Sequence, residues 1–135
     1  MGYTIEHIEG IGGAYGAKLR DAGIGTTTAL LKAAADPEGR QHLAQTTGID
    51  AARILLWANM ADLMRIKGVG KQFAELLEAA GVDTVKELRT RNAANLAARM
   101  AEVNAQRKLT RTVPAESMVG RWIAEAGTLP PLLSY

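Results

Sequence analysis

The chain contains no cysteine, which excludes disulfide cross-links and thiolate zinc sites as sources of its stability. Aromatic residues make up only 4% of its 135 residues, whereas alanine and leucine are abundant. This balance favours helices that pack closely on small side chains over a β-sandwich, which needs more β-branched and aromatic residues. The sequence therefore predicts an all-α fold without a sheet.

Long hydrophobic runs are also missing. No apolar stretch approaches the roughly 18 to 20 residues of a membrane span, so no membrane partner is expected. The segment from Met1 to His7 has neither a basic region nor a hydrophobic stretch, so no secretory signal is predicted and we expect a cytoplasmic protein. A hydrophobic content of 47% is ordinary for a folded protein and argues against disorder.

Patterns typical of enzymes are absent as well. The chain shows no nucleophile–base pair and no paired catalytic carboxylates. The run Gly10–Gly13 lacks the preceding strand and the βαβ context of a dinucleotide site. His7 lies near Glu6 and Glu9 without forming a recognisable set of metal ligands, and His42 is isolated. We predict a protein with no enzymatic activity, no cofactor and no metal site.

An internal duplication organises the chain. The segment Ile8-Glu9-Gly10-Ile11-Gly12 returns 58 residues later as Ile66-Lys67-Gly68-Val69-Gly70. Further matches at this offset pair Tyr15 with Phe73, Leu19 with Leu77, Ala22-Gly23-Ile24 with Ala80-Gly81-Val82, Thr26 with Thr84 and Leu30 with Leu88. Beyond these, Ile54, Trp57, Ala58 and Ala61 correspond to Val119, Trp122, Ile123 and Ala126 at an offset of 65. The second copy therefore carries about seven extra residues, around Arg107 to Val113.

The duplication predicts a first repeat over residues 1–64 and a second repeat with a C-terminal tail over residues 65–135, together one compact globular unit. The first repeat has 5 Lys/Arg and 7 Asp/Glu, a net charge of −2, whereas the second has 11 and 7, a net charge of +4. The overall charge of +2 is only mildly basic. The distribution of charge therefore says more about possible partners than its total.

Each repeat predicts the same series of helices. A Gly-x-Gly turn precedes a helix over residues 13–22 or 71–80, ended by a left-handed Gly23 or Gly81. The next helices are expected over 27–35 and 85–91, with Thr26 and Thr84 as N-caps and Thr84 and Glu87 forming a capping box. Asp36, Asp50 and Asn92 predict the starts of helices that end near Gly48, at residue 65 and at residue 106, and a last helix surrounds residues 119–126.

The helix over residues 51–65 is apolar nearly all round. Such a helix should lie at the centre of the core, and we expect it to join both repeats. Trp57 on this helix and Trp122 in the second repeat occupy matching positions in apolar stripes. Both side chains are therefore predicted to belong to the core and not to a base-stacking surface.

The two Gly-x-Gly turns are the candidate binding sites. Glycine allows a tight turn and a close approach of a ligand, because no Cβ is in the way. Each turn also ends at a helix N-terminus, where backbone N–H groups and the positive end of the helix dipole face outward. Such a site suits a phosphate oxygen and recognises no base. Ile11 and Val69, between the glycines, should point inward and anchor the turns.

The pattern apolar-x-Gly-apolar-Gly followed by a helix resembles the helix-hairpin-helix motif. The resemblance implies two such repeats packed on a shared core, and non-specific contact with a DNA or RNA backbone. The phosphate-binding positions that it implies are Lys67, Gly68, Val69, Gly70 and Lys71, with Gly10, Ile11 and Gly12 as their equivalents in the first copy. Nearly the whole chain also resembles an uncharacterised bacterial family of stand-alone tandem helix-hairpin-helix proteins of unknown function, through the runs Ala61–Gly70 and Ala79–Leu88.

The first turn departs from this pattern. It has Glu9 where the second turn has Lys67, and Gly13 where the second has Lys71. An anionic side chain beside a phosphate site lowers affinity, so any binding should run through the second turn and be weak and non-specific. The cluster Arg107, Lys108 and Arg111 and the pair Arg89 and Arg91 either extend a basic binding face or are simply solvated.

The sequence leaves a second function open. Gly-x-Gly turns also serve only to pack two helices, and the partner is then another protein for which the chain acts as an adaptor or scaffold component. An exposed apolar face is expected in that case. Its candidate residues lie in the tail: Pro130, Pro131, Leu132, Leu133 and Tyr135.

Overall fold

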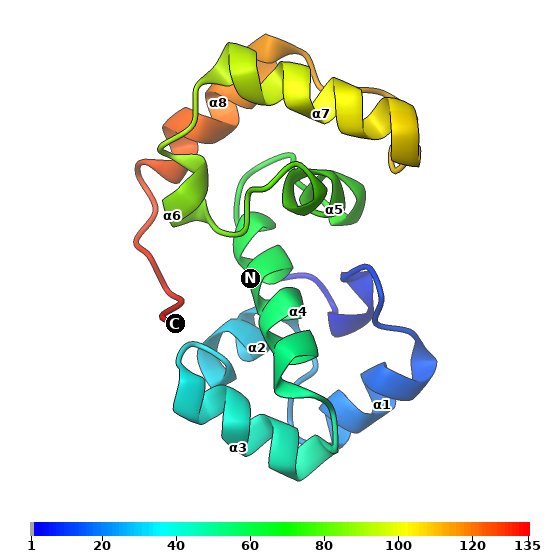
Figure 1. Cartoon of the computed structure of the whole chain (residues 1–135). Coiled ribbons are helices and arrows are strands. Elements are labelled where there is room, and N and C mark those ends of the chain that lie inside the picture. Colours follow the sequence, from blue (N-terminus) through cyan, green and yellow to red (C-terminus); the bar gives the residue numbers. More distant parts are fainter. Residues whose placement is uncertain (1) are drawn as a thin grey trace. The chain divides into compact units, whose positions relative to one another are not determined.

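A computed structural model of the chain, which describes residues 2–135, confirms the predicted all-α fold (Figure 1). Residues 2–135 form eight α-helices, one 3-10 helix and no sheet; a single isolated bridge pairs Thr4 with Thr26. No helix in this part of the chain has the length and apolar character to cross a membrane. The elements are η1 (Ile5–His7), α1 (Gly13–Asp21), α2 (Thr27–Ala33), α3 (Pro37–Thr47), α4 (Ala51–Leu63), α5 (Lys71–Ala79), α6 (Val85–Leu88), α7 (Ala93–Arg107) and α8 (Glu116–Ala126).

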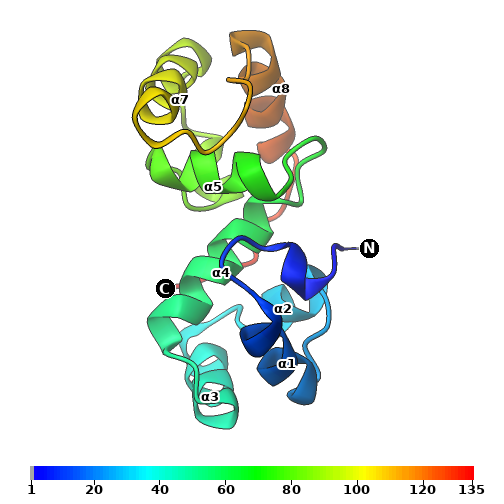
Figure 2. The ribbon, with the colours of Figure 1, turned by 90° about the vertical axis from the view of Figure 1, so that its right-hand side faces the viewer.

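The chain divides into two compact units. Unit 1 consists of Met1–Asp62 together with Leu132–Tyr135, and unit 2 consists of Leu63–Pro131. The chain thus leaves unit 1 at the end of α4 and returns to it with its last four residues. In unit 2, α7 and α8 lie side by side and α5 packs against α7 (Figure 2). That both repeats share one core stays a prediction.

The predicted N-caps are confirmed. Thr26 Oγ1 accepts a hydrogen bond from the N–H of Ala29 at 3.1 Å, and Asp36 Oδ1 accepts one from Gly39 at 2.7 Å. Asn92 and Thr84 cap α7 and α6 in the same way, and Asp50 Oδ1 accepts from Ala52 N–H at the start of α4. The local polarity of the sequence therefore fixes where most helices begin.

The capping box expected at α6 forms only in part, and this helix is shorter than predicted. Thr84 Oγ1 accepts from the N–H of Glu87 at 3.3 Å, but the Glu87 carboxylate accepts from Arg91 Nε at 3.2 Å. The N–H groups of Thr90 and Arg91 donate to oxygens three residues back, at Glu87 and Leu88. These tighter bonds end α6 at Leu88 instead of residue 91.

The two tryptophans lie in the core as predicted. Trp57 is 2% exposed and Trp122 is 3% exposed. The ring of Trp57 packs edge-on against Tyr15 with 5.1 Å between centroids, and Trp122 packs against Phe73 at 5.2 Å. The two units therefore use one aromatic pair each at equivalent positions, which supports the duplication read from the sequence.

The last four residues of the chain are held on unit 1 by a buried arginine. Arg40 is 6% exposed, and its guanidinium donates to Ala34 O at 2.9 Å and to Ser134 O at 2.7 Å. The hydroxyl of Tyr135 donates to Asn59 Oδ1 at 2.9 Å. Unit 1 is thus completed by a segment distant in the sequence.

Candidate functional site: two glycine turns

The second glycine turn connects α4 to α5. The N–H of Ile66 donates to Leu63 O at 3.1 Å, and the N–H of Val69 donates to Ile66 O at 3.0 Å. Gly68 has φ +90°, a conformation that a residue with a Cβ adopts only with strain. Gly70 is the N-cap of α5, no side chain caps this helix end, and a Cβ on Gly70 would meet nothing within 4 Å. The N-terminus of α5 is therefore open.

The first turn has the same backbone geometry. The N–H of Ile11 donates to Ile8 O at 3.1 Å, and Gly10 has φ +95°. Gly12 is the N-cap of α1, again without a side-chain cap, and a Cβ on Gly12 or Gly13 would meet nothing within 4 Å. The two copies thus build the same turn, each ending at an open helix N-terminus.

A tryptophan lies behind the first glycine of each turn. A Cβ on Gly10 would lie 3.4 Å from Trp57 Nε1, and a Cβ on Gly68 would lie 3.6 Å from Trp122 Nε1. These glycines therefore face the core as well as adopting a positive φ. The second glycine of each turn faces open space instead. The helix end is therefore the more open end of each turn.

The eight predicted site residues fall into these two turns and divide by burial. Ile11 is 4% exposed and Val69 is not exposed at all, which confirms that they point inward. Such buried residues can offer a ligand only their backbone. The exposed or half-exposed residues are Gly10, Gly12, Lys67, Gly68, Gly70 and Lys71.

Glu125 is a site residue that sequence reasoning missed. Its carboxylate, in the last turn of α8, accepts the backbone N–H of Lys67 at 3.2 and 3.3 Å. This donor of the second turn is therefore already bound by an anion of the protein. No pattern in the sequence indicates this contact, because it joins positions 58 apart.

Near the first turn, the acidic side chain of Glu6 pairs with an arginine. The Glu6 carboxylate accepts two hydrogen bonds from Arg20, at 2.8 and 2.6 Å, and this contact lowers the pKa of Glu6 to about 2. His7 stacks on Tyr3 with 4.7 Å between ring centroids. Within residues 2–135, no three His, Cys, Asp or Glu side chains are arranged to hold a metal ion.

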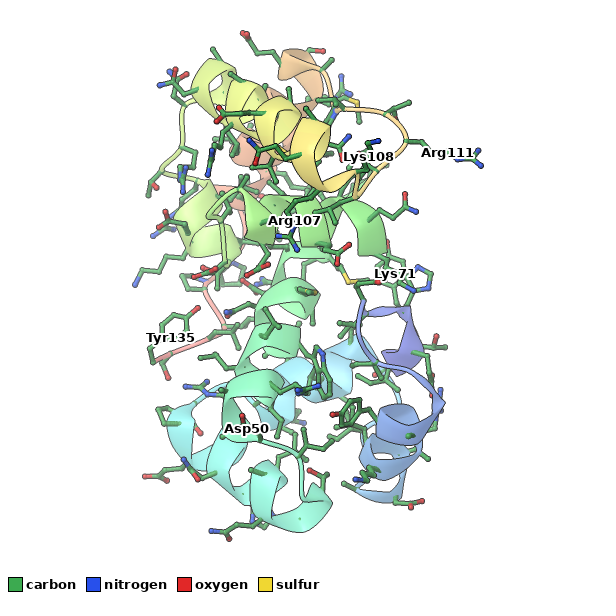
Figure 3. The ribbon with its side chains drawn as sticks, turned by 45° about the vertical axis from the view of Figure 1, so that its right-hand side comes forward. Asp50, Lys71, Arg107, Lys108, Arg111 and Tyr135 are labelled. Carbon is green, nitrogen blue, oxygen red and sulfur yellow. The ribbon has the colours of Figure 1, made fainter. Side chains whose placement is uncertain are left out.

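The two arginine sets proposed to extend the basic face differ in their contacts. Arg91 donates to the Glu87 carboxylate at 3.2 Å and to Gly81 O at 2.9 Å, so it stabilises the corner before α7. Arg107, Lys108 and Arg111 are exposed at the end of α7 and in the loop that follows (Figure 3). Arg89 is exposed as well, so the side chains of these two sets that are exposed to a ligand are Arg89, Arg107, Lys108 and Arg111.

Fold and turns together define a small all-α protein built from two glycine-turn units. Residues 9–129 match the family described as Domain of unknown function (DUF4332), and the chain belongs to this family. The matched region contains Gly12 and Gly70, which are the second glycines of the two turns. It also contains both tryptophans and the loop between α7 and α8. No curated protein and no solved structure matches the chain.

Proposed function

We propose that the chain is a non-enzymatic module that binds the phosphate backbone of nucleic acid through the second glycine turn, without reading bases. We interpret α4, the turn and α5 as a helix-hairpin-helix motif. The observation that carries the proposal is the open, uncapped N-terminus of α5 at Gly70, flanked by the exposed Lys67 and Lys71.

Phosphate is the ligand whose chemistry fits this arrangement. The first turn of a helix leaves N–H groups without intrahelical acceptors, and the helix dipole adds a partial positive charge at the same end. An oxygen of a phosphodiester can accept from these groups while the ammonium groups of Lys67 and Lys71 act as nearby point charges. Contacts of this kind position a backbone and carry no information about base sequence.

The charges of the two units favour the second turn over the first. Unit 2 has 11 Lys/Arg and 7 Asp/Glu, whereas unit 1 has 5 and 7. At the turns themselves, Glu9 replaces Lys67 and Gly13 replaces Lys71. A polyanion is therefore repelled from the first turn and attracted to the second, although the backbone geometry is the same.

The proposal is tested by charge reversal at the second turn, with a matched reversal in unit 1. Lys67→Glu/Lys71→Glu should abolish binding of labelled duplex and single-stranded DNA at low salt. The control Lys18→Glu/Lys32→Glu changes the net charge equally at two exposed positions of unit 1 and should keep most of the affinity. Fluorescence anisotropy measures both, and circular dichroism checks that each variant folds.

Equal binding by the wild type and the turn variant, or no wild-type binding, would contradict the proposal. An adaptor function is the other outcome, and the exposed Pro130, Pro131 and Leu132 support it. Binding of a protein partner should then survive high salt and be lost when Leu132 is changed to serine. This substitution leaves the backbone contacts of Ser134 with Arg40 and Ala35 in place.

A further inference from the structure

The loop between α7 and α8 distinguishes unit 2 from unit 1. It spans residues 108–115, whereas the corresponding connection in unit 1, between α3 and α4, spans only residues 48–50. Both connections begin with a left-handed residue that closes the preceding helix. The N–H of Gly48 donates to Ala44 O and that of Lys108 donates to Asn104 O, each at 2.8 Å.

The residue in this left-handed position differs between the units. Gly48 has φ +75° and Lys108 has φ +52°. Within residues 2–135, Lys108 is the only residue other than glycine with a positive φ. Glycine adopts this conformation without strain and is the usual residue at a helix C-terminus, whereas a lysine is strained there. Strained residues are found preferentially at functional sites. The lysine at this position is one observation that favours a functional role for its side chain.

The loop is held in one conformation by a buried asparagine. Asn104 is 8% exposed; its Oδ1 accepts from the N–H of Thr110 at 2.9 Å, and its Nδ2 donates to Thr110 O at 3.1 Å. The Thr110 hydroxyl donates in turn to Thr112 O at 2.8 Å. Charged side chains carried by an ordered loop lose less entropy on binding than those on a disordered one.

The loop and the end of α7 carry only positive charge. Arg107, Lys108 and Arg111 are exposed, and no acidic residue occurs between Glu102 and Glu116. Within the described residues no ion pair involves any of these three cations, and Glu102 pairs with Arg99 at 3.1 Å. Figure 3 shows Lys108 and Arg111 on the same side of unit 2 as Lys71.

We propose that these three residues, here called the basic loop (Arg107, Lys108 and Arg111), form a second contact surface for the phosphate backbone of nucleic acid. The proposal rests on the proposed function for the class of ligand, but it assigns a site that the glycine turn does not include. Lysine contacts a phosphate as a point charge and arginine as a planar fork with two donors. Together with the turn, the basic loop provides two separate points of attachment on unit 2.

Two points of attachment predict a dependence on the length of the ligand. A strand long enough to reach both should bind more tightly than one that occupies either alone, because the second contact becomes intramolecular. Each lost phosphate contact should also lower the salt dependence, by about one in the slope of log affinity against log salt. Removing two cations of the basic loop should therefore lower the magnitude of this slope by about two.

The test removes two charges from the loop and, as a control, two from unit 1. Lys108→Gly/Arg111→Gln installs at position 108 the residue that unit 1 uses at Gly48, so the fold should not suffer. The control Lys18→Gln/Lys32→Gln has the same net charge. At low salt the loop variant should bind a labelled duplex about tenfold more weakly than the wild type, whereas the control stays within about twofold. The melting temperature of the loop variant should be unchanged or higher.

The outcomes separate this inference from the proposed function. If the loop variant binds as tightly as its control while Lys67→Glu/Lys71→Glu abolishes binding, the basic loop has no role and the turn stands. If the loop variant loses affinity and the turn variant does not, the loop stands and the turn fails. Equal competition by polyglutamate at the same charge concentration, or no binding of the wild type, would overturn the inference.

Discussion

The two glycine turns have the same backbone and opposite surroundings. Gly10 and Gly68 share a positive φ near +90°, and each has the Nε1 of a buried tryptophan behind it. Beside these turns, however, the first copy places Glu9 where the second places Lys67. The backbone geometry has stayed the same while the charge changed. A turn that only packed two helices would need the shared backbone geometry. A ligand would detect the difference in charge.

The largest expected effect tests whether the two units are stabilised alike. Trp57→Ala and Trp122→Ala should each cost about 3–5 kcal/mol of unfolding free energy, because each removes a buried ring that packs on an aromatic partner and on a glycine turn. Urea denaturation followed by circular dichroism measures the cost. A loss below about 1 kcal/mol for either would place that ring outside the core.

The second prediction concerns substitutions of the left-handed residues at the ends of α3 and α7. Gly48→Ala should cost about 1 kcal/mol, because a Cβ is strained at φ +75°. Lys108→Gly should instead stabilise the protein by about 0.5–1 kcal/mol, because it removes such strain. The shift of the urea midpoint gives both signs. Destabilisation by Lys108→Gly would mean that the lysine side chain supports the fold, and the basic loop would lose its main argument.

The third prediction concerns the carboxylate bound to the second turn. Glu125→Gln keeps an acceptor for the Lys67 N–H but removes a negative charge beside the proposed phosphate site. The affinity for duplex DNA at low salt should rise about twofold, since a unit charge several ångströms away in water is worth roughly half a kcal/mol. Glu38→Gln, the same change at an exposed position of unit 1, serves as the control. Equal affinities for both variants would show that Glu125 does not face the ligand.

The smallest expected effect lies in unit 1, which alone has the exposed ion pair of Glu6 with Arg20. Because the pair lowers the pKa of Glu6 to about 2, its stabilisation is present at neutral pH and is lost as the pH falls from about 4.5 toward 2. Glu6→Gln should therefore make stability less dependent on pH in this range. Melting temperatures of the variant and the wild type between pH 5 and pH 2 measure the difference, and parallel curves would contradict the assignment.

Features that depend only on residues a few positions apart were predictable from the sequence. The caps at Thr26, Asp36 and Asn92 and the left-handed Gly23 and Gly81 follow from side-chain chemistry within a few positions. Because the sequence is duplicated, each of these conclusions about one copy also applies to the other. The positions of the turns and the inward direction of their central residues therefore follow from the sequence.

Contacts between distant positions were not predictable in this way. Glu125 reaches Lys67 across 58 positions and Arg40 reaches Ser134 across 94, and no periodicity encodes either pairing. The link from Asn104 to Thr110 is local, but it depends on the burial of a polar side chain, which the sequence pattern does not reveal. Such residues decide which donors of a turn remain for a ligand and how a loop presents its charges.

The central claim, that the second turn binds phosphate, is tested most directly by the salt dependence of binding. The second turn and two or three nearby cations, which together neutralise about three phosphates, predict a slope of log affinity against log salt of roughly −3 between about 50 and 200 mM, with affinity no tighter than micromolar at physiological salt. Lys67→Glu/Lys71→Glu should remove this binding for duplexes of unrelated sequence alike. A slope near zero, or a variant that follows the wild-type curve, would contradict the account.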